Sequence, residues 1–387
     1  MGMAKKVVFA LVLTLTAGAA HAIEPYLEKT VLFERDSGGY MLYRIPGIVV
    51  TRTGTILAYA EARKSDRSDW HASDIILRRS TDGGRTWSAA AVIGAMPEVF
   101  PKNPAAVAKK LGLGPGAGVT YNNPVAIADR NGAVHFLFCV EYMRAFYMRS
   151  DDDGKSFSKP VEITPAFAGF RRNWPWVVLA TGPGHGIQLK NGRLLVPVWL
   201  SLGSGGGAHG ESVTSAIYSD NHGVTWKAGE IAVPNTEETA SPNETSAVQL
   251  ADGRVMLNVR SPSKAQRRIV VYSKDGVRHW STPVFHQQLP EPVCFASMVR
   301  LGKGRLLYVS PDSGGRERKN LTVRVSYDEG TTWSVKRVVE SGPSAYADLA
   351  MLPDVGILCL YEAGRERPYE TLTLGRFNFE WLAEGAE

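Results

Sequence analysis

Near the N-terminus, the residue whose type and setting most clearly suggest a chemical role is Arg44, in the tetrapeptide Tyr43-Arg44-Ile45-Pro46. It lies in apolar, strand-forming sequence that continues to Val50. A strand of this composition buries its side chains, and a buried guanidinium is tolerated only with a compensating partner. A pocket for an anion would supply that partner, and a structural arginine on a strand rim is the alternative. The tetrapeptide by itself leaves both interpretations open.

A short repeat marks the turns of the strands that would position this arginine. The pattern Ser-x-Asp-x-Gly-x-Thr/Ser-aromatic, an Asp box, begins at Ser80, Ser150 and Ser326, with weaker copies at Ser219 and Ser273. In a hairpin turn the Asp accepts hydrogen bonds from nearby amides, the Gly takes a conformation that other residues resist, and the aromatic ring packs on the adjacent strands. The Asp boxes are therefore predicted to hold turns, and no catalytic role is assigned to them.

The spacing of the Asp boxes indicates the architecture. The copies lie 53 to 70 residues apart, which suits one four-stranded blade per repeat with loops of uneven length. Residues 23–387 divide into six units of about 61 residues, and a blade shared between the two termini would close the ring and protect its edges. The predicted fold is all-β, a six-bladed β-propeller over residues 23–387 without a separate lectin domain. A short helix is expected within residues 101–113.

The first 22 residues have the order of a secretory signal peptide. Lys5 and Lys6 precede an apolar run from Val7 to Ala20, and small residues lead to Ala22. Residues 1–22 are therefore predicted to be a signal peptide of a secreted or periplasmic protein. No later stretch approaches eighteen uninterrupted apolar residues, so no integral membrane segment is expected in the mature chain, which is predicted to be a monomer.

Net charge and cysteine content further narrow the classes of function and fold that the chain can belong to. The formal net charge is +6, without the long Lys/Arg runs of a nucleic-acid-binding tail, so no nucleic-acid partner is expected. Cys139, Cys294 and Cys359 are predicted to be buried free thiols, since an odd count argues against a disulfide framework and no His stands in an obvious partnering motif. Metal-ligand spacing is absent as well, and no metal or cofactor is predicted.

The Tyr-Arg-Ile-Pro motif, followed by repeated Asp boxes, resembles the exo-α-sialidases (neuraminidases) of the bacterial and animal type, across essentially all of residues 23–387. The resemblance implies a six-bladed β-propeller that removes terminal α-ketosidically linked sialic acids from glycoconjugates with retention. It further implies a covalent tyrosyl-sugar intermediate, reached without cofactor or metal. The expected partners are sialylated glycans.

In that family three arginines grip the carboxylate of the sugar, and the matching positions resemble Arg44, Arg260 and Arg318. A planar guanidinium pairs bidentately with a carboxylate, which makes Lys a poor substitute. Arg316 is the rival for the third position, and Arg318 is preferred because it precedes a short polar pair and a Leu at the start of a strand. Glu362 resembles the glutamate that orients the first arginine.

The stretch from Glu61 through Arg63 to Asp69 resembles the family segment that carries the general acid/base. Asp69 is the predicted acid because of its spacing from Arg63 and from the following strand. Asp66 and Asp74 are neighbours of the same chemical type. The resemblance places Arg63 beside the carboxylate site.

Residues 344–349 resemble the nucleophile segment of the family, with Tyr346 as the attacking phenol and Glu244 as the base that takes its proton. Sialic acid carries a carboxylate at its anomeric carbon, so an anionic nucleophile would be repelled and a neutral phenol would not. A free Tyr has a pKa of about 10, so an adjacent base is needed near neutrality. Four aromatic residues are candidates to line the sugar pocket: Trp70, Tyr121, Trp174 and Trp176.

Two other functions compete with this hypothesis. A related ulosonic-acid glycosidase, specific for Kdn or Kdo, would keep the three arginines and differ around the C5 substituent. A non-catalytic Asp-box propeller used for binding would be expected to lack Tyr346, Glu244 or one of the arginines. All of these residues are present, which favours the enzyme.

Overall fold

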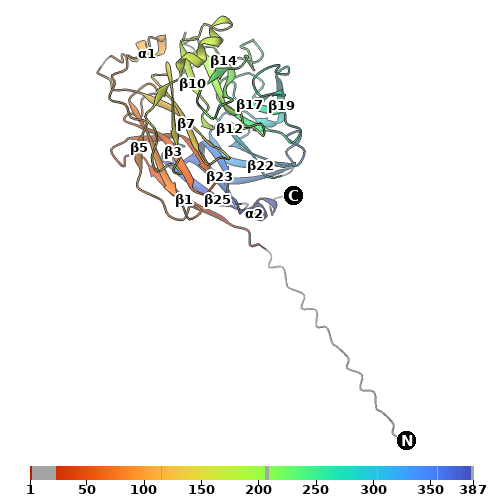
Figure 1. Ribbon diagram of the computed structural model, residues 1–387. Helices are drawn as coiled ribbons and strands as arrows, with labels where there is room; N and C mark the ends of the chain where they lie inside the picture. Colours follow the sequence, from red (N-terminus) through yellow and green to blue (C-terminus); the bar gives the residue numbers. More distant parts are fainter. Residues whose placement is uncertain (2–22, 115, 205–208, 303, 355, 385–387) are drawn as a thin grey trace.

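The computed structural model describes residues 1–387 except 2–22, 115, 205–208, 303, 355 and 385–387. Residues 2–22 of the predicted signal peptide thus lie outside the described residues. Antiparallel sheets dominate the described part of the chain and follow one another around a ring (Figure 1). The prediction of a six-bladed β-propeller is confirmed.

The first three blades come from residues 42–228. Blade 1 contains β2 (Leu42–Val50), β3 (Ile56–Arg63), β4 (Ser73–Ser80) and β5 (Ala91–Ile93). Blade 2 contains β6 (Tyr121–Ala128), β7 (Val134–Val140), β8 (Arg144–Ser150) and β9 (Val161–Glu162), with β11 (Gly184–His185) parallel to β6. Blade 3 contains β10 (Val178–Thr181), β12 (Ile187–Gln188), β13 (Leu194–Ser201), β14 (Ser212–Ser219) and β15 (Lys227–Ala228).

The last three blades follow in the same manner. Blade 4 contains β16 (Thr245–Gln249), β17 (Val255–Val259), β18 (Arg267–Ser273) and β19 (Val284–Pro290). Blade 5 contains β20 (Ser297–Arg300), β21 (Leu306–Pro311), β22 (Lys319–Ser326) and the first part of β23 (Val335–Met351). Blade 6 contains the rest of β23, β24 (Ile357–Ala363), β25 (Thr371–Phe377) and β1 (Leu27–Glu34).

The ring is closed by the two ends of the chain. The strand β1 pairs antiparallel with β25, from Leu27 opposite Phe377 to Glu34 opposite Thr371, and the two strands lie together near α2 (Phe379–Ala383) in Figure 1. The long strand β23 joins the last two blades into one seven-stranded sheet. Blade 6 therefore mixes N-terminal and C-terminal strands, as the repeat count predicted.

The Asp boxes hold the turns at one end of the strands. In the first, the Asp82 carboxylate accepts from the Thr86 amide at 3.0 Å and from the Thr86 hydroxyl at 2.6 Å, and Gly84 has φ +85°. The same contacts recur at Asp152 and Asp328. Because neighbouring strands alternate in direction, residues at the start of β2 and the end of β3 lie at the opposite end of blade 1.

The middle of the ring is held by polar contacts between blades. The buried Asp348 carboxylate accepts from the Ile48 amide at 2.9 Å and from the Ser297 hydroxyl at 2.7 Å, and its Oδ1 lies 2.8 Å from Nδ1 of His185. Gly47 leaves room for the Tyr59 ring, which a Cβ would overlap at 2.1 Å. These contacts fix the innermost strands, and Asp348 fixes the part of β23 that also carries Tyr346.

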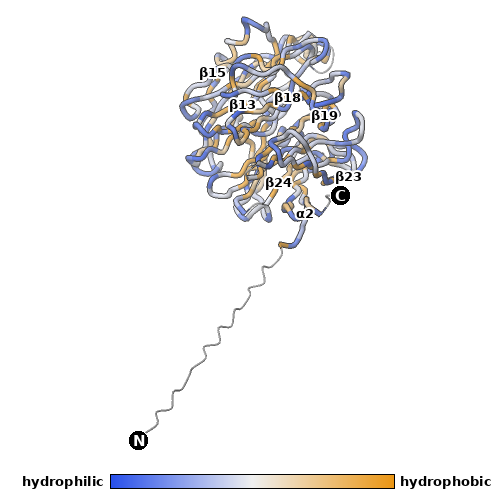
Figure 2. Tube along the Cα trace, turned by 90° about the vertical axis from the view of Figure 1, so that its right-hand side faces the viewer, coloured by the Kyte–Doolittle hydropathy of each residue, from blue (hydrophilic) through white to orange (hydrophobic). Residues whose placement is uncertain are grey.

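Apolar side chains fill the spaces within and between the blades, and Figure 2 shows hydrophobic positions along the interior of the trace. The three cysteines are buried free thiols, as predicted, and burial raises the pKa of Cys139 and of Cys294 to about 12. The short helix α1 (Ala106–Lys110) confirms the helix expected within 101–113, and a 3-10 helix spans Thr164–Arg172. None of the described helices is long and apolar enough to cross a membrane.

Candidate active site

Arg44 lies near the start of β2, where a bulge between Arg44 and Gly47 interrupts the pairing with β3. The bulge places Ile45 at φ +58°, a conformation that a β-branched residue rarely adopts. The fully buried Glu362 carboxylate accepts from Nε and Nη2 of Arg44, at 2.9 and 3.1 Å, and from the Ile45 amide at 3.1 Å. It also accepts from the Tyr346 amide at 3.2 Å. One carboxylate therefore compensates the buried arginine and fixes the strand of Tyr346 beside it.

Tyr346 and Glu244 form a second polar group, between blades 6 and 4. The Tyr346 hydroxyl donates to Oε1 of Glu244 at 2.6 Å and accepts from Nη1 of Arg260 at 2.7 Å. The same Arg260 nitrogen also contacts Oε2 of Glu244. Burial raises the pKa of the Tyr346 phenol well above its usual value and Glu244 adds to the shift, whereas Arg260, Arg318 and Arg44 oppose it. The phenol is thus neutral, with a carboxylate placed to receive its proton.

Three guanidinium groups surround the Tyr346 ring. The Cζ atoms of Arg44, Arg318 and Arg260 lie 5.1, 5.3 and 6.0 Å from its centroid. Arg316 instead is exposed and donates to the Pro262 carbonyl at 3.2 Å. The structure brings together the three arginines named from the sequence and leaves the rival outside. We call Arg44, Arg260 and Arg318 the arginine clamp.

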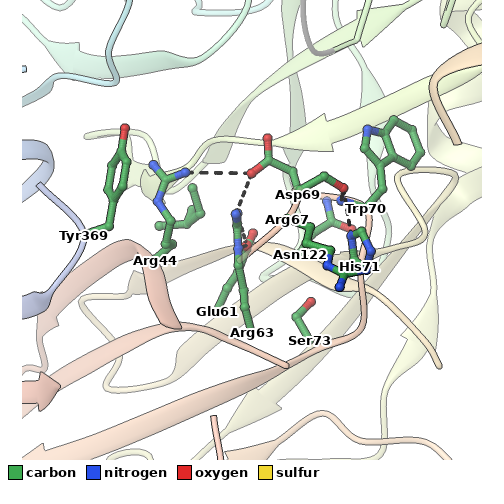
Figure 3. A network of polar contacts seen from close by, with 12 residues as sticks. Arg44, Glu61, Arg63, Arg67, Asp69, Trp70, His71, Ser73, Asn122 and Tyr369 are labelled. Atoms are coloured by element: carbon green, nitrogen blue, oxygen red, sulfur yellow. Dashed lines mark hydrogen bonds and ion pairs between the residues drawn. The ribbon is translucent and has the colours of Figure 1, made fainter. Parts of the chain in front are cut away.

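Asp69 approaches the clamp from blade 1 (Figure 3). Its Oδ1 lies 2.5 Å from Nη1 of Arg63 and 3.8 Å from Nη1 of Arg44, and Arg63 also pairs with the buried Glu61. Burial would raise the pKa of the Asp69 carboxyl, but Arg63 and Arg44 together outweigh it and hold that pKa well below its usual range. Asp69 is therefore ionised in the free protein. Arg63 lies beside the clamp, because the guanidinium groups of Arg63 and Arg44 both contact the Asp69 carboxylate.

The two other carboxylates of that segment lie elsewhere. Asp74 accepts from the Tyr40 hydroxyl at 2.8 Å and pairs with Lys64 at 3.0 Å, and Asp66 is exposed. Of the three, only Asp69 lines the cavity enclosed by the clamp.

That cavity has a volume of about 500 Å³. Six of its lining residues are charged or phenolic: Arg44, Asp69, Glu244, Arg260, Arg318 and Tyr346. All six were named from the sequence, from segments spread over 300 residues. An anionic ligand of sugar size can therefore meet three guanidiniums, a phenol with its base and a further carboxylate in one cavity.

The comparisons with known proteins agree with this arrangement. Residues 113–359 match the BNR repeat-like domain family, and residues 78–89 match the BNR/Asp-box repeat. A sialidase of Micromonospora viridifaciens is 29% identical over 93% of this chain. The chain belongs to the sialidase family. It spans 55% of the length of that bacterial relative.

Solved sialidase structures share the fold. The Hadza microbial sialidase Hz136 superposes with a TM-score of 0.74 and 25% identity, over 92% of this chain and 69% of its own. The Trypanosoma rangeli sialidase in complex with 2,3-difluorosialic acid, described as a covalent intermediate, superposes with a TM-score of 0.69 and 20% identity, over 92% and 59% of the two chains.

The aromatic residues suggested for the pocket do not line the cavity enclosed by the arginine clamp. Trp70 packs on Tyr142 with ring centroids 4.7 Å apart, and Trp176 packs on Phe167. Tyr121 is buried near Phe138, and Trp174 is partly buried against the core of blades 2 and 3. None of the four lines this cavity, so the suggestion was wrong for it, although Trp70 lines an adjoining pocket together with Arg44 and Asp69. Trp199 and His209 line the clamp cavity instead.

His209 is a cavity residue that no sequence pattern indicated. Its ring lies among aromatic neighbours, 4.8 Å from Trp199 and 4.9 Å from Tyr142. Burial lowers its pKa to about 4 against the opposing pull of Asp69 and Glu244. The imidazole is therefore neutral at pH 7, and no motif spacing in the sequence marks it.

We expect Arg318→Lys to weaken binding of a sialoside and of carboxylate inhibitors together, by about tenfold to a hundredfold. An ammonium cannot reproduce the bidentate geometry of a guanidinium with a carboxylate. Arg316→Lys is the matched control and is expected to change either value less than twofold, because its side chain is exposed. KM and inhibition constants measure both effects. If the two variants exchanged these results, Arg316 would be the third clamp residue.

Proposed function

We propose that this chain is an exo-α-sialidase, which hydrolyses terminal α-ketosidically linked sialic acids with retention through a tyrosyl-sugar intermediate. The single observation that carries the proposal is the 2.6 Å hydrogen bond from the Tyr346 hydroxyl to Glu244, inside the arginine clamp. Membership of the sialidase family supports the same activity.

The arginine clamp indicates which class of substrate the site binds. Three guanidiniums around one phenol favour a ligand whose carboxylate sits next to its reacting carbon. In an α-ketoside of sialic acid that carbon is C2. A carboxylate bound by the clamp brings C2 toward the Tyr346 oxygen. It also repels an anionic nucleophile, so a phenol that is neutral until attack avoids this electrostatic cost.

The proposed reaction has two steps. In the first, Glu244 takes the phenolic proton, the Tyr346 oxygen bonds to C2, and the glycosidic bond breaks. Asp69, which takes up a proton from solvent when the substrate carboxylate binds beside it, gives that proton to the departing oxygen. In the second, Asp69 takes a proton from water, which attacks C2 as the bond to Tyr346 breaks, and Glu244 returns its proton to the Tyr346 oxygen. Two inversions at C2 give net retention. Arg260, whose Nη1 donates to the phenolic oxygen, stabilises the phenolate in both steps.

The predicted signal peptide supports a location outside the cytoplasm, and the proposed substrates are sialylated glycans encountered in the periplasm or the medium.

A trapping experiment tests the proposed nucleophile. We expect a 2,3-difluorosialic acid reagent to label the wild-type protein once, on the peptide that contains Tyr346. The fluorine at C3 slows the second step, so the adduct accumulates. Mass spectrometry of a proteolytic digest locates the label, and Tyr346→Phe is expected to take up none. A stable adduct on Glu244 or Asp69 would contradict the assignment.

A further inference from the structure

Tyr369 contacts two of the three clamp arginines, and no sequence motif points to it. It lies in the loop between β24 and β25, which follows Glu362 on the same hairpin. Its ring centroid is 4.2 Å from Cζ of Arg44, and its hydroxyl accepts from Nη1 of Arg318 at 2.9 Å. Figure 3 shows the ring beside the Arg44 guanidinium, on the side away from Asp69.

The loop that carries Tyr369 is fixed by its neighbour Glu370. The Glu370 carboxylate accepts from the amides of Arg365, Glu366 and Arg367 at 3.0, 3.0 and 2.9 Å. The Glu370 amide donates to the Ala363 carbonyl at 3.0 Å, and the Glu370 carbonyl accepts from the Arg35 amide at 2.9 Å. The loop backbone thus surrounds the Glu370 carboxylate and is hydrogen-bonded to Ala363 and Arg35. The backbone that carries Tyr369 is therefore held in place next to the clamp.

The clamp arginines differ in how their charges are compensated. Arg44 pairs with Glu362, and Arg260 pairs with Glu244. Arg318 has no carboxylate within 4.0 Å among the residues that the structure describes. Its hydrogen bonds go to two neutral oxygens, the Tyr369 hydroxyl at 2.9 Å and the Val293 carbonyl at 2.6 Å.

A neutral acceptor orients a guanidinium without cancelling its charge. A carboxylate in the same place would compete with an anionic ligand, and an unheld arginine would lose several rotamers on binding. The contact of the Tyr369 ring with the face of Arg44 is favourable by cation–π attraction and leaves the edges of that guanidinium free for hydrogen bonds.

We propose that Tyr369 is a positioning residue of the arginine clamp. It holds Arg318 with its charge uncompensated and keeps Arg318 and Arg44 at a set separation, so that both meet one carboxylate. The inference deepens the proposed function and rests on it. Tyr369 takes no part in proton transfer or nucleophilic attack.

The test is a double-mutant cycle with Tyr369→Phe and Arg318→Lys. Phe keeps the ring on Arg44 and removes the hydroxyl acceptor. We expect Tyr369→Phe to raise KM for a sialoside and the Kd for free N-acetylneuraminic acid about tenfold each, with kcat changed less than twofold. In the Arg318→Lys background the same change is expected to alter Kd less than twofold, because groups that act through one contact are not additive.

Two further variants make the test specific. Tyr369→Leu also removes the ring from Arg44 and is expected to weaken binding beyond Tyr369→Phe. Tyr40→Phe is the matched control, since it removes a hydroxyl bonded to Asp74 outside the cavity, and it is expected to change nothing. Thermal unfolding checks that all variants fold.

Three results would overturn the inference: an unchanged KM and Kd in Tyr369→Phe, a fall in kcat at constant KM, or equal effects of Tyr369→Phe in both backgrounds. Calorimetric binding separates this inference from the proposed function. If the wild type binds the sugar acid without hydrolysing any sialoside, the proposed reaction fails and the binding cycle still decides the role of Tyr369. If the wild type binds no sugar acid, both the clamp and this inference are wrong.

Discussion

Tyr346→Phe, Glu244→Ala and the double variant are each expected to lower kcat for a natural sialoside by about 10³-fold or more, with the double variant little worse than the poorer single one. Phe leaves no oxygen to attack C2, and Ala leaves a phenol whose pKa is raised by burial without a base to receive its proton. When two groups serve the same step, removing the second adds little to the loss of rate caused by removing the first. Steady-state kinetics on all three proteins measures the cycle.

The chain offers a matched control for this cycle. The Tyr361 hydroxyl also donates to a glutamate, Glu340, at 3.3 Å, but neither residue lines the cavity. Tyr361→Phe is expected to leave kcat within about twofold. Multiplicative losses in the double variant of Tyr346 and Glu244 would mean that the two residues serve separate steps, and the pairing of nucleophile and base would have to be abandoned.

Asp69→Asn is expected to slow the release of natural leaving groups by about 10² to 10⁴-fold and that of an activated aryl leaving group by less than tenfold in a single turnover. A sugar alkoxide needs a proton as it departs, and an aryl oxide with a low pKa does not. Single-turnover measurement isolates this first step from the hydrolysis of the intermediate. Asp66→Asn and Asp74→Asn serve as controls. Equal losses on both substrates would assign the acid role elsewhere, with Asp66 the next candidate.

The electrostatics of Asp69 add a pH dependence to this prediction. In the free protein Arg63 and Arg44 keep the carboxyl ionised, which suits a base and not an acid. A substrate carboxylate on Arg44 adds a nearby negative charge and displaces water, and both changes raise the pKa of Asp69. Activity that needs the protonated carboxyl is lost as the pH rises through this bound-state pKa. The alkaline limb of kcat should therefore be absent in Asp69→Asn.

Much of the site could be predicted because its residues lie at strand ends that a motif or spacing marks. Arg44 belongs to a recognisable tetrapeptide, Tyr346 to a recognisable segment, and Asp boxes show where the opposite ends of the strands turn. The pairing of Arg44 with Glu362 spans 318 residues, yet the charge of Arg44 in an apolar strand already required a partner.

The rest depended on loop conformations that no periodic pattern encodes. Tyr369 follows a run of charged residues, and this context predicts an exposed loop position without a functional role for the ring. Trp70 was suggested for the sugar pocket, but its ring is buried and packs on Tyr142. His209 has no neighbour in the sequence that signals a site. Sequence periodicity describes strands, whereas these side chains are placed by the turns between them.

The closing of the ring by β1 and β25 also sets an order of events during synthesis. Arg44 is made 318 residues before Glu362, a wait of roughly 15 to 60 s at translation rates of about 5 to 20 residues per second. Until then Arg44 lacks its closest carboxylate partner, and β1 is an open edge that only the final hairpin can cover. That same hairpin carries Glu362 and Tyr369. A nascent or truncated chain that lacks it would have neither a closed ring nor an assembled clamp, so the site becomes functional only when the last strands have been made.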